Sequence, residues 1–401
     1  MSLSVEDEII EQFATKASED SMLELIQYAK INDITNQGIV KLATVLVDSG
    51  GKLKPSNTHG CYDIPSTGGP SSLSTIICPI ILRGLGKQVI KLGVPGRPAG
   101  GIDSLAQISG YKTNLSEEEI RKVIDQGGYV HFITNHNYAP LDGNLFSYRK
   151  QNNGLNIPAL VIASILSKKI AVGLSHIGLD VRVSSFGNFG STWEQARANS
   201  KRFNEVASLC GITTKCFITD GFTPQQPYIG RGEALVAVDK IFNSADNYSL
   251  KKHFDQCLAM CLSLADMKGE PTRVILKKAY NAFSQNITLQ QGSLDSYYFI
   301  VDEVQRQHKY SVQSSSNGFL HINMQVIRDT ICNIQNKHNK AFPDPCGIIL
   351  QRNAGDYVSL NDQICTFRCV DEHVNDFRES ITKAFIVRDN PIDKHFYEEV
   401  L

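Results

Sequence analysis

The sequence predicts an α/β protein with a helical N-terminal segment, a larger part built on a mixed or parallel sheet, and a C-terminal α+β element. Apolar residues recur at helical spacing over residues 5–47. From residue 58 onward, short apolar segments alternate with helical ones, which is typical of a parallel sheet covered by helices on both faces. From residue 311 the pattern changes again to short strands and helices, which indicates a separate element.

The N-terminal helices are predicted from apolar residues that share a helical face. These residues are Ile9, Ile10, Phe13, Leu23, Leu25, Ile26, Ile39, Leu42, Ala43, Leu46 and Val47. Asp33 and Asn36 are residue types that favour helix starts. The glycine- and serine-rich composition of residues 49–56 favours a loop or hinge after the last of these helices.

In the α/β part, Val89–Ile90 and residues 130–133 have the apolar character of buried strands. Ser116 followed by Glu119 forms a capping box, which predicts a helix through residue 125. Further strands are expected at residues 178–183 and 216–220, where apolar residues lie between turn signals.

Residues 141–173 interrupt this alternation. Pro158 suits the first turn of a helix and Gly173 suits its end. We expect this helix to pack with the N-terminal helices rather than with the sheet. The predicted domains are therefore residues 1–48 plus 141–173, which are helical, residues 58–140 plus 174–310, which are α/β, and the α+β element at 311–401.

Composition is that of an ordinary globular enzyme, with 42% hydrophobic and 20% charged residues among 401. The net charge of −1 gives no global attraction to nucleic acid or an anionic membrane. No apolar stretch is long enough for a transmembrane helix, and the acidic N-terminus lacks a signal core. We therefore expect a cytoplasmic protein with no nucleic-acid or membrane partner.

The ten cysteines have two interpretations. Cys257 and Cys261, like Cys365 and Cys369, are four residues apart, a spacing compatible with metal or redox chemistry. However, no CxxC pair exists and no histidine stands at a zinc-finger spacing. We favour reduced, mostly buried thiols, and we expect neither a metal nor a cofactor.

The stretch from Asp63 to Gly69 reads Asp-Ile-Pro-Ser-Thr-Gly-Gly and precedes a long apolar run. Paired glycines let a backbone approach a ligand closely and expose amide donors. Ser66, Thr67, Gly68 and Gly69 are therefore either a cradle for phosphate or a sugar hydroxyl, or a plain polar turn.

A second candidate anion site is the loop at residues 91–101, which contains four glycines, two prolines, Lys91 and Arg97. A rigid loop with cations is compatible with anion binding. It is equally compatible with a structural crossover whose charges are solvated. The helix start at Ile229–Glu233 and the loop residue His136 are weaker candidates, for an anion and for proton transfer respectively.

The third candidate lies on the helix predicted after Pro158. Ser164 and Lys168 are four residues apart and share a face, and Arg149 precedes them in the sequence. A hydroxyl, an ammonium and a guanidinium can hydrogen-bond the carbonyls and ring nitrogen of a planar heterocycle. Lys168 and Lys169 taken alone would instead be solvated surface charges.

Together these segments resemble the class of nucleoside phosphorylases that includes thymidine and pyrimidine-nucleoside phosphorylases, and more distantly anthranilate phosphoribosyltransferase. The resemblance covers about residues 5–390, and its most specific part is the run from Ile157 to Val183. Its other carriers are residues 63–69, 99–105, 139–140, 148–149 and 219–220. The resemblance implies a helical domain hinged to a large α/β domain, and a homodimer formed through the helical domain.

The reaction implied is phosphorolysis of a pyrimidine nucleoside to free base and (deoxy)ribose 1-phosphate. By position, Arg149, Ser164 and Lys168 match the family's base-binding residues. Arg149 and Lys168 are implied to be catalytic, because cations near the base carbonyls stabilise the leaving anion. The residues implied to bind phosphate or sugar are Ser66, Thr67, Gly68, Gly69, Lys91 and Gly101.

One departure from the family opens alternatives. The family has Lys-His immediately before its Ser-Thr-Gly-Gly, whereas this chain has Ile64 and Pro65. Pro65 also lacks a backbone donor. Lys91 or Arg97 could replace the lost charge. Otherwise the chain is a phosphate-independent nucleoside hydrolase or base-exchange enzyme, with His136 or Asp63 as general base, or a non-catalytic pyrimidine-binding protein.

Overall fold

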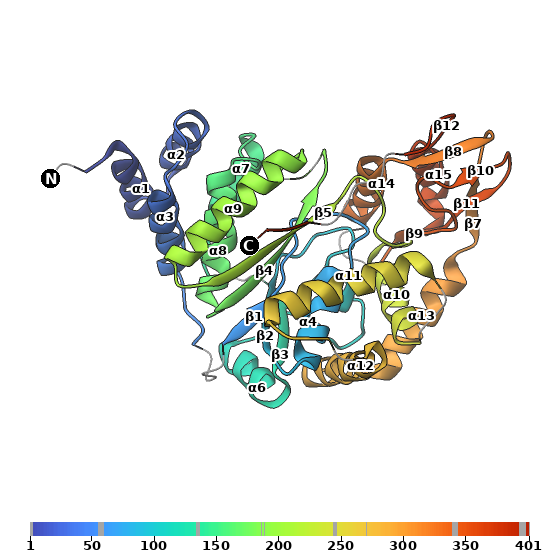
Figure 1. Ribbon diagram of the computed structural model, residues 1–401, viewed down its shortest axis with the longest axis horizontal. Coiled ribbons are helices and arrows are strands. Elements are labelled where there is room, and N and C mark those ends of the chain that lie inside the picture. The colour runs from blue at the N-terminus through green and yellow to red at the C-terminus, as the bar shows by residue number, and fades with distance from the viewer. Residues whose placement is uncertain are drawn as a thin grey trace. The chain divides into compact units, whose positions relative to one another are not determined.

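The computed structural model describes residues 3–54, 60–133, 137–185, 187, 189–243, 247–269, 271–338, 344–392 and 398–400, the last three by backbone alone. The chain forms two compact units (Figure 1). Unit 1 is made of residues 1–67, 134–218 and 398–401, and unit 2 of residues 68–133 and 219–397. Within the described residues, no helix combines the length and apolarity needed to cross a membrane.

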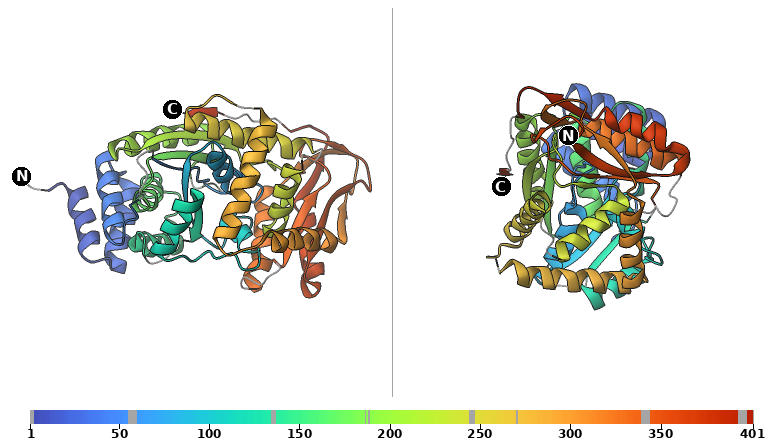
Figure 2. Two further views of the ribbon diagram at one scale, coloured as in Figure 1. Left: turned by 90° about the horizontal axis from the view of Figure 1, so that it is seen from below. Right: turned by 90° about the vertical axis from the view of Figure 1, so that its right-hand side faces the viewer.

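Unit 1 is built around helices whose starts are encoded locally. The side chains of Ser4, Ser18 and Thr35 cap α1 (Val5–Thr15), α2 (Glu19–Ile31) and α3 (Asn36–Asp48). The three helices lie next to one another, in blue in Figure 2. The predicted helical N-terminus is thus confirmed, although Asp33 lies in the connecting loop with a positive φ of 51° and does not start a helix.

The segment that interrupts the alternation forms two helices of unit 1, α7 (Pro140–Gln151) and α8 (Pro158–Ala171). Each begins at a proline, whose fixed φ suits the first turn. Gly173, with φ of +73°, follows the end of α8. The expected packing is confirmed, because α8 lies against α3 (Figure 1). The sequence did not predict α7.

The strands of unit 1 follow the order β13-β5-β4-β1. β1 (Cys61–Asp63) is parallel to β4 (His176–Val183), with Tyr62 opposite His176. The short β13 (Glu398–Val400) is antiparallel to β5 (Thr213–Asp220). α9 (Trp193–Leu209) packs on β4 and on α3 and α8. The predicted strands at 178–183 and 216–220 are confirmed.

Unit 2 contains the parallel pair β2 (Gln88–Gly93) and β3 (Tyr129–Ile133). Helices α4 (Ser74–Gly84), α5 (Gly101–Leu105) and α6 (Glu117–Gly127) pack on these strands. The capping box predicted at Ser116 and Glu119 is present at the start of α6. The α/β fold class is therefore confirmed.

Four further helices complete the middle of unit 2. They are α10 (Arg231–Phe242), α11 (Tyr248–Ala265), α12 (Thr272–Leu289) and α13 (Leu294–Gln307). α11 and α12 both pack on α4, and α13 packs on α10. Cys257 and Cys261 share the buried face of α11, and all ten cysteines are free thiols, as expected.

The C-terminal part of unit 2 carries two antiparallel sheets (Figure 2). One has the order β10-β8-β12, from Tyr357–Val358, Gly318–Ile322 and Phe385–Arg388. The other has the order β6-β9-β11-β7, from Tyr228–Ile229, Cys346–Leu350, Gln363–Cys369 and Tyr310–Gln313. Helix α14 (Met324–Lys337) packs on β9 and on α15 (Val374–Thr382), which follows the 3-10 turn η1 (Asp371–His373). The α+β character predicted for residues 311–401 is confirmed, whereas the three domain boundaries stay predictions.

Candidate functional site

The base-binding residues predicted from the sequence lie on α7 and α8 of unit 1. Ser164 and Lys168 are one turn apart on α8, and the ammonium Nζ of Lys168 donates to the hydroxyl Oγ of Ser164 over 2.8 Å. The same ammonium forms a short ion pair with the carboxylate of Asp142, in the first turn of α7. Asp142 therefore joins the two helices through Lys168. We call Asp142, Ser164 and Lys168 the α7–α8 cluster.

The side chains of this cluster are largely buried. The side chain of Asp142 is 6% exposed and that of Lys168 is 16% exposed. Ser164 is also buried. Lys168 has three N–H donors, and among the residues that the structure describes Asp142 and Ser164 accept two of them.

Arg149, in the last turn of α7, is buried more deeply than Lys168. Its guanidinium donates to three backbone carbonyls, those of Gly154 at 2.9 Å, Leu155 at 3.1 Å and Leu160 at 3.2 Å. Burial lowers the pKa of Arg149 to about 10, against the opposing effect of the Asp142 carboxylate. Arg149 thus remains charged at neutral pH and holds the loop between α7 and α8 in place.

The electrostatics of this region favour electron-rich ligands. Two cations, Arg149 and Lys168, accompany the single carboxylate of Asp142, which leaves a net positive charge. In a poorly solvated environment such a charge interacts strongly with a carbonyl oxygen or a delocalised anion. Of the two cations, Arg149 is buried and the Lys168 side chain is 16% exposed.

Lys169 was expected to be a solvated surface charge, and this prediction is wrong. Its ammonium lies 2.6 Å from the carboxylate of Asp63 in β1, and the two side chains are 5% and 0% exposed. Adjacent helical residues point in directions roughly 100° apart, so Lys168 and Lys169 reach different partners. Asp63 is thereby committed to a buried ion pair, which disfavours it as the general base of a hydrolase.

The candidate phosphate turn continues from β1. Its backbone pairs with β4. The backbone amide of Asp180 donates to the carbonyl of Pro65, and the amide of Thr67 donates to the carbonyl of Asp180. The hydroxyl of Thr67 accepts from the amide of Arg182 over 2.8 Å. The Thr67 amide is therefore engaged within the sheet, while its hydroxyl proton is not used by this bond.

Arg182 is a buried cation beside the turn that the sequence reasoning did not single out. Its Nε and Nη2 atoms bind one oxygen of Asp180 at 3.0 and 2.7 Å. The two residues are neighbours on one face of β4, a relation given by their spacing of two. Because Asp180 neutralises it, Arg182 adds little net charge at the turn.

Ile64 fills a core position of unit 1. It is fully buried, and a Cβ added at Gly178 would lie 2.8 Å from its Cγ1. Because Gly178 has no side chain, Ile64 has room to pack there. Position 64 therefore favours an apolar side chain. Gly68 and Gly69 have φ of +123° and open space at the position of a Cβ, so conformation rather than crowding requires glycine there.

The remaining predicted phosphate ligands belong to unit 2. Lys91 lies within β2 and is 3% exposed. Gly101 begins α5, where an added Cβ would lie 2.7 Å from the carbonyl oxygen of Thr75. Close packing of α5 on α4 therefore explains this glycine. The backbone amide of Arg97 donates to Asp103 in the same segment.

Two weaker candidates have different outcomes. His136 lies outside the described residues. The helix start at Ile229–Glu233 holds a buried ion cluster, in which the Glu233 carboxylate binds Arg368 Nε at 2.6 Å and His308 Nε2 at 2.9 Å. Burial acts to raise the pKa of Glu233, but Arg368 and His308 outweigh it and the pKa is lowered. This helix start is thus occupied by internal charge pairs.

Comparison with known proteins supports the resemblance. A pyrimidine-nucleoside phosphorylase of Staphylococcus epidermidis is 25% identical over 378 residues, covering 88% of this chain and 85% of that protein. The pyrimidine-nucleoside phosphorylase of Geobacillus stearothermophilus is 22% identical, with coverages of 88% and 84%. That of Staphylococcus aureus is 22% identical over 388 residues, with coverages of 92% and 88%. No protein-family model matches the chain.

Among solved structures, anthranilate phosphoribosyltransferase from Thermus thermophilus aligns with a TM-score of 0.45 and 11% identity, covering 74% of this chain and 97% of that one. Structural likeness at this level is too weak to argue from. The sequence relatives nevertheless confirm the predicted resemblance: this chain is similar to pyrimidine-nucleoside phosphorylases over nearly its whole length.

Proposed function

We propose that this protein is a pentosyltransferase of the nucleoside phosphorylase type. It cleaves a pyrimidine nucleoside with phosphate to give the free base and (deoxy)ribose 1-phosphate. The observation that supports this most is the α7–α8 cluster, in which a carboxylate and a hydroxyl hold the Lys168 ammonium. The names of the relatives supply the substrate class.

In the proposed reaction, a phosphate oxygen forms a bond to the anomeric carbon as the glycosidic C–N bond breaks. The electron pair of that bond passes to the base, whose negative charge spreads onto its carbonyl oxygens. Lys168 donates a hydrogen bond to one of these oxygens, and this bond strengthens as charge develops. Asp142 and Ser164 orient the ammonium, and Arg149 adds positive potential behind it.

A second candidate keeps the base site but replaces phosphate by water or another base as acceptor. The apolar, buried Ile64 favours it, because the turn lacks the cation that the family places at this position. The engaged amide of Thr67 also reduces the number of donors for a dianion. Ser66, Thr67, Gly68 and Gly69, with Lys91 and Gly101, remain the proposed phosphate or sugar ligands for the first candidate.

Product analysis separates the two candidates. Thymidine, uridine and cytidine are incubated with the full-length protein, with and without phosphate, and both products are identified. We expect base release to rise with phosphate concentration and to yield sugar 1-phosphate. Free sugar formed at a rate independent of phosphate would support a hydrolase instead. Stabilisation by uracil or thymine with no turnover under any acceptor would support a non-catalytic pyrimidine-binding protein.

We also propose that the protein is a homodimer formed through its N-terminal helices. Leu3, Val5 and Ile31, on or beside α1 and α2, are 50%, 63% and 81% exposed. Exposed apolar side chains of this size favour an interface. Light scattering after gel filtration should give the mass of two chains, and Ile31→Asp should shift it toward one. A monomer at micromolar concentration would contradict the proposal.

A further inference from the structure

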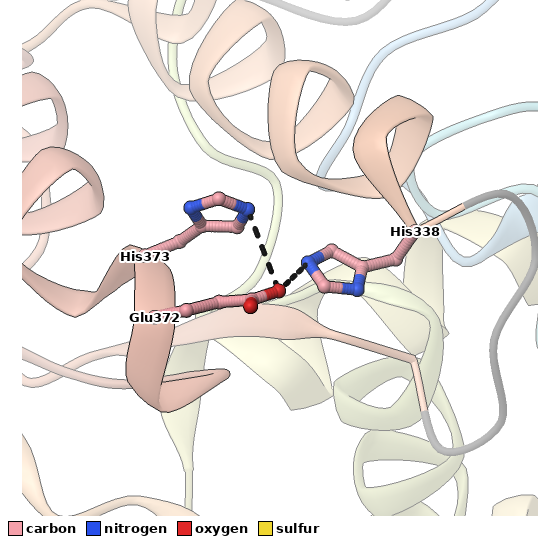
Figure 3. Close-up of side chains that lie close together, drawn as sticks. All are labelled: His338, Glu372 and His373. Carbon is pink, nitrogen blue, oxygen red and sulfur yellow. Dashed lines mark ion pairs between the residues drawn. The ribbon is translucent and has the colours of Figure 1, made fainter.

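Two histidines and a glutamate converge in the C-terminal part of unit 2, and none of them belongs to the proposed catalytic site. His338 follows the last residue of α14, while Glu372 and His373 are neighbours in η1 (Figure 3). One ligand atom from each residue lies within 4.8 Å of the other two. His338 and Glu372 are far apart in the sequence, so no spacing rule could have brought them together.

The distances match those of a small coordination sphere. Nε2 of His338 lies 3.2 Å from Oε1 of Glu372, and Nε2 of His373 lies 3.7 Å from the same oxygen. Zinc–ligand bonds of about 2.0–2.1 Å place neighbouring ligand atoms of a tetrahedron about 3.3–3.4 Å apart. The distances from Glu372 Oε1 to the two histidine nitrogens are thus close to those between the ligands of a bound zinc ion.

The imidazole ring of His338 also favours a metal site. Its Nε2 atom is buried and has no hydrogen-bond partner among the residues that the structure describes. Glu372 Oε1 is close enough for a hydrogen bond, but the N–H direction does not point at it. The two atoms are thus close without being hydrogen-bonded to each other, so Nε2 of His338 can serve as a metal ligand.

The elements that carry the three side chains pack together. α14 packs on α15, and both helices bury apolar residues, among them Ile331, Ile334, Phe377 and Ile381. His373 precedes the first residue of α15, but its side chain does not cap that helix and remains available as a ligand. The side chains of His338 and His373 are 20% and 21% exposed, and that of Glu372 is 65% exposed. The two histidines are therefore mostly covered by protein, while the glutamate is open to solvent.

The donor set selects the kind of ion. Two imidazoles and one carboxylate suit zinc and neighbouring transition metals, whereas magnesium and calcium prefer oxygen ligands throughout. We propose that His338, Glu372 and His373 bind a divalent transition-metal ion such as Zn²⁺, with water in the fourth position. The ion ties the C-terminal end of α14 to η1 and thereby stabilises this part of unit 2. This proposal is independent of the proposed catalytic function.

Calorimetry on the full chain, without a polyhistidine tag and after chelator treatment, tests the site. Zn²⁺ should bind with a stoichiometry near one and raise the melting temperature, as a ligand that prefers the folded state must. His338→Gln and Glu372→Gln should each weaken binding by about tenfold to a hundredfold or more, because loss of even a supporting residue has effects of that size. Mg²⁺ should not compete.

Asp371→Asn is the matched control, since it removes a neighbouring carboxylate of η1 that lies outside the group. It should bind Zn²⁺ as the wild type does, and all variants should melt alike in the presence of chelator. If His338→Gln fails to fold, the Zn²⁺ affinity of His373→Gln, a substitution in η1, provides the same test. Equal Zn²⁺ affinity in wild type and folded ligand variants, or no saturable binding by the wild type, would overturn the proposal.

Discussion

The α7–α8 cluster and the turn at residues 64–67 belong to the same unit, but they treat charge in opposite ways. At the cluster, Lys168 and the nearby Arg149 accompany the single carboxylate of Asp142. At the turn, Asp180 neutralises Arg182, and the apolar Ile64 occupies the core. The contrast supports the proposed base site more directly than the proposed phosphate site, because Asp180 neutralises the charge of Arg182 at the turn.

The largest expected effect is on the support of the cluster. Arg149→Ala removes a buried cation and leaves the carbonyls of Gly154, Leu155 and Leu160 without their donor. We expect a loss of about 3–5 kcal/mol in the free energy of unfolding, because each buried acceptor left without a donor costs about 1–3 kcal/mol. Chemical denaturation measures it. A loss below about 1 kcal/mol would show that Arg149 is not the anchor of this loop.

The turn can be probed by restoring the charge that the family carries there. Ile64→Lys would place an ammonium against Gly178 and Phe217 in the core of unit 1. Burying an unpaired charge should lower the free energy of unfolding by about 3 kcal/mol or more, without improving phosphate binding. A stable variant with a lower KM for phosphate would instead show that the turn readily accepts a cation at this position.

The cluster itself is tested by Lys168→Ala. Loss of a hydrogen bond from a charged donor costs about 1.5–3 kcal/mol, which corresponds to a fall in kcat/KM of about tenfold to a hundredfold. Lys150→Ala is the matched control, because Lys150 is an exposed lysine on the neighbouring helix α7. Equal kcat/KM values for the two variants would remove Lys168 from the proposed site.

The smallest of these effects is expected for Asp142→Asn. The amide keeps the shape of the side chain but loses the charge that orients Lys168. We expect a fall of about tenfold in kcat/KM, since an ion pair becomes a hydrogen bond from the ammonium to a neutral amide oxygen. Nucleoside KM and kcat measured at saturating phosphate provide the test. An unchanged kcat/KM would show that Ser164 alone suffices to hold the ammonium.

The sequence predicted the part of the site that lies within one helix. Ser164 and Lys168 share a face because of their spacing, and the structure confirms that they are hydrogen-bonded. Asp142 was missed because its role depends on how α7 packs beside α8. A signal did exist, since Asp142 and Arg149 are two helical turns apart and share a face, but α7 itself was not predicted.

Other residues could not be interpreted from local pattern. Lys169 resembles its neighbour Lys168 in sequence, and only the position of Asp63 in β1 reveals its buried ion pair. Arg149 was predicted to bind the base with Ser164 and Lys168, and its three carbonyl partners come from the loop and the start of α8. Such partners depend on backbone geometry, which residue types do not encode directly.

A crystal structure of the protein with uracil bound would test the central claim most directly. We predict that the ring lies against α7 and α8, with the Lys168 ammonium and the Ser164 hydroxyl within hydrogen-bond distance of its polar edge. Finding the ring elsewhere, or finding Lys168 still bound only to Asp142 and Ser164 while the ring makes no contact with it, would contradict the account.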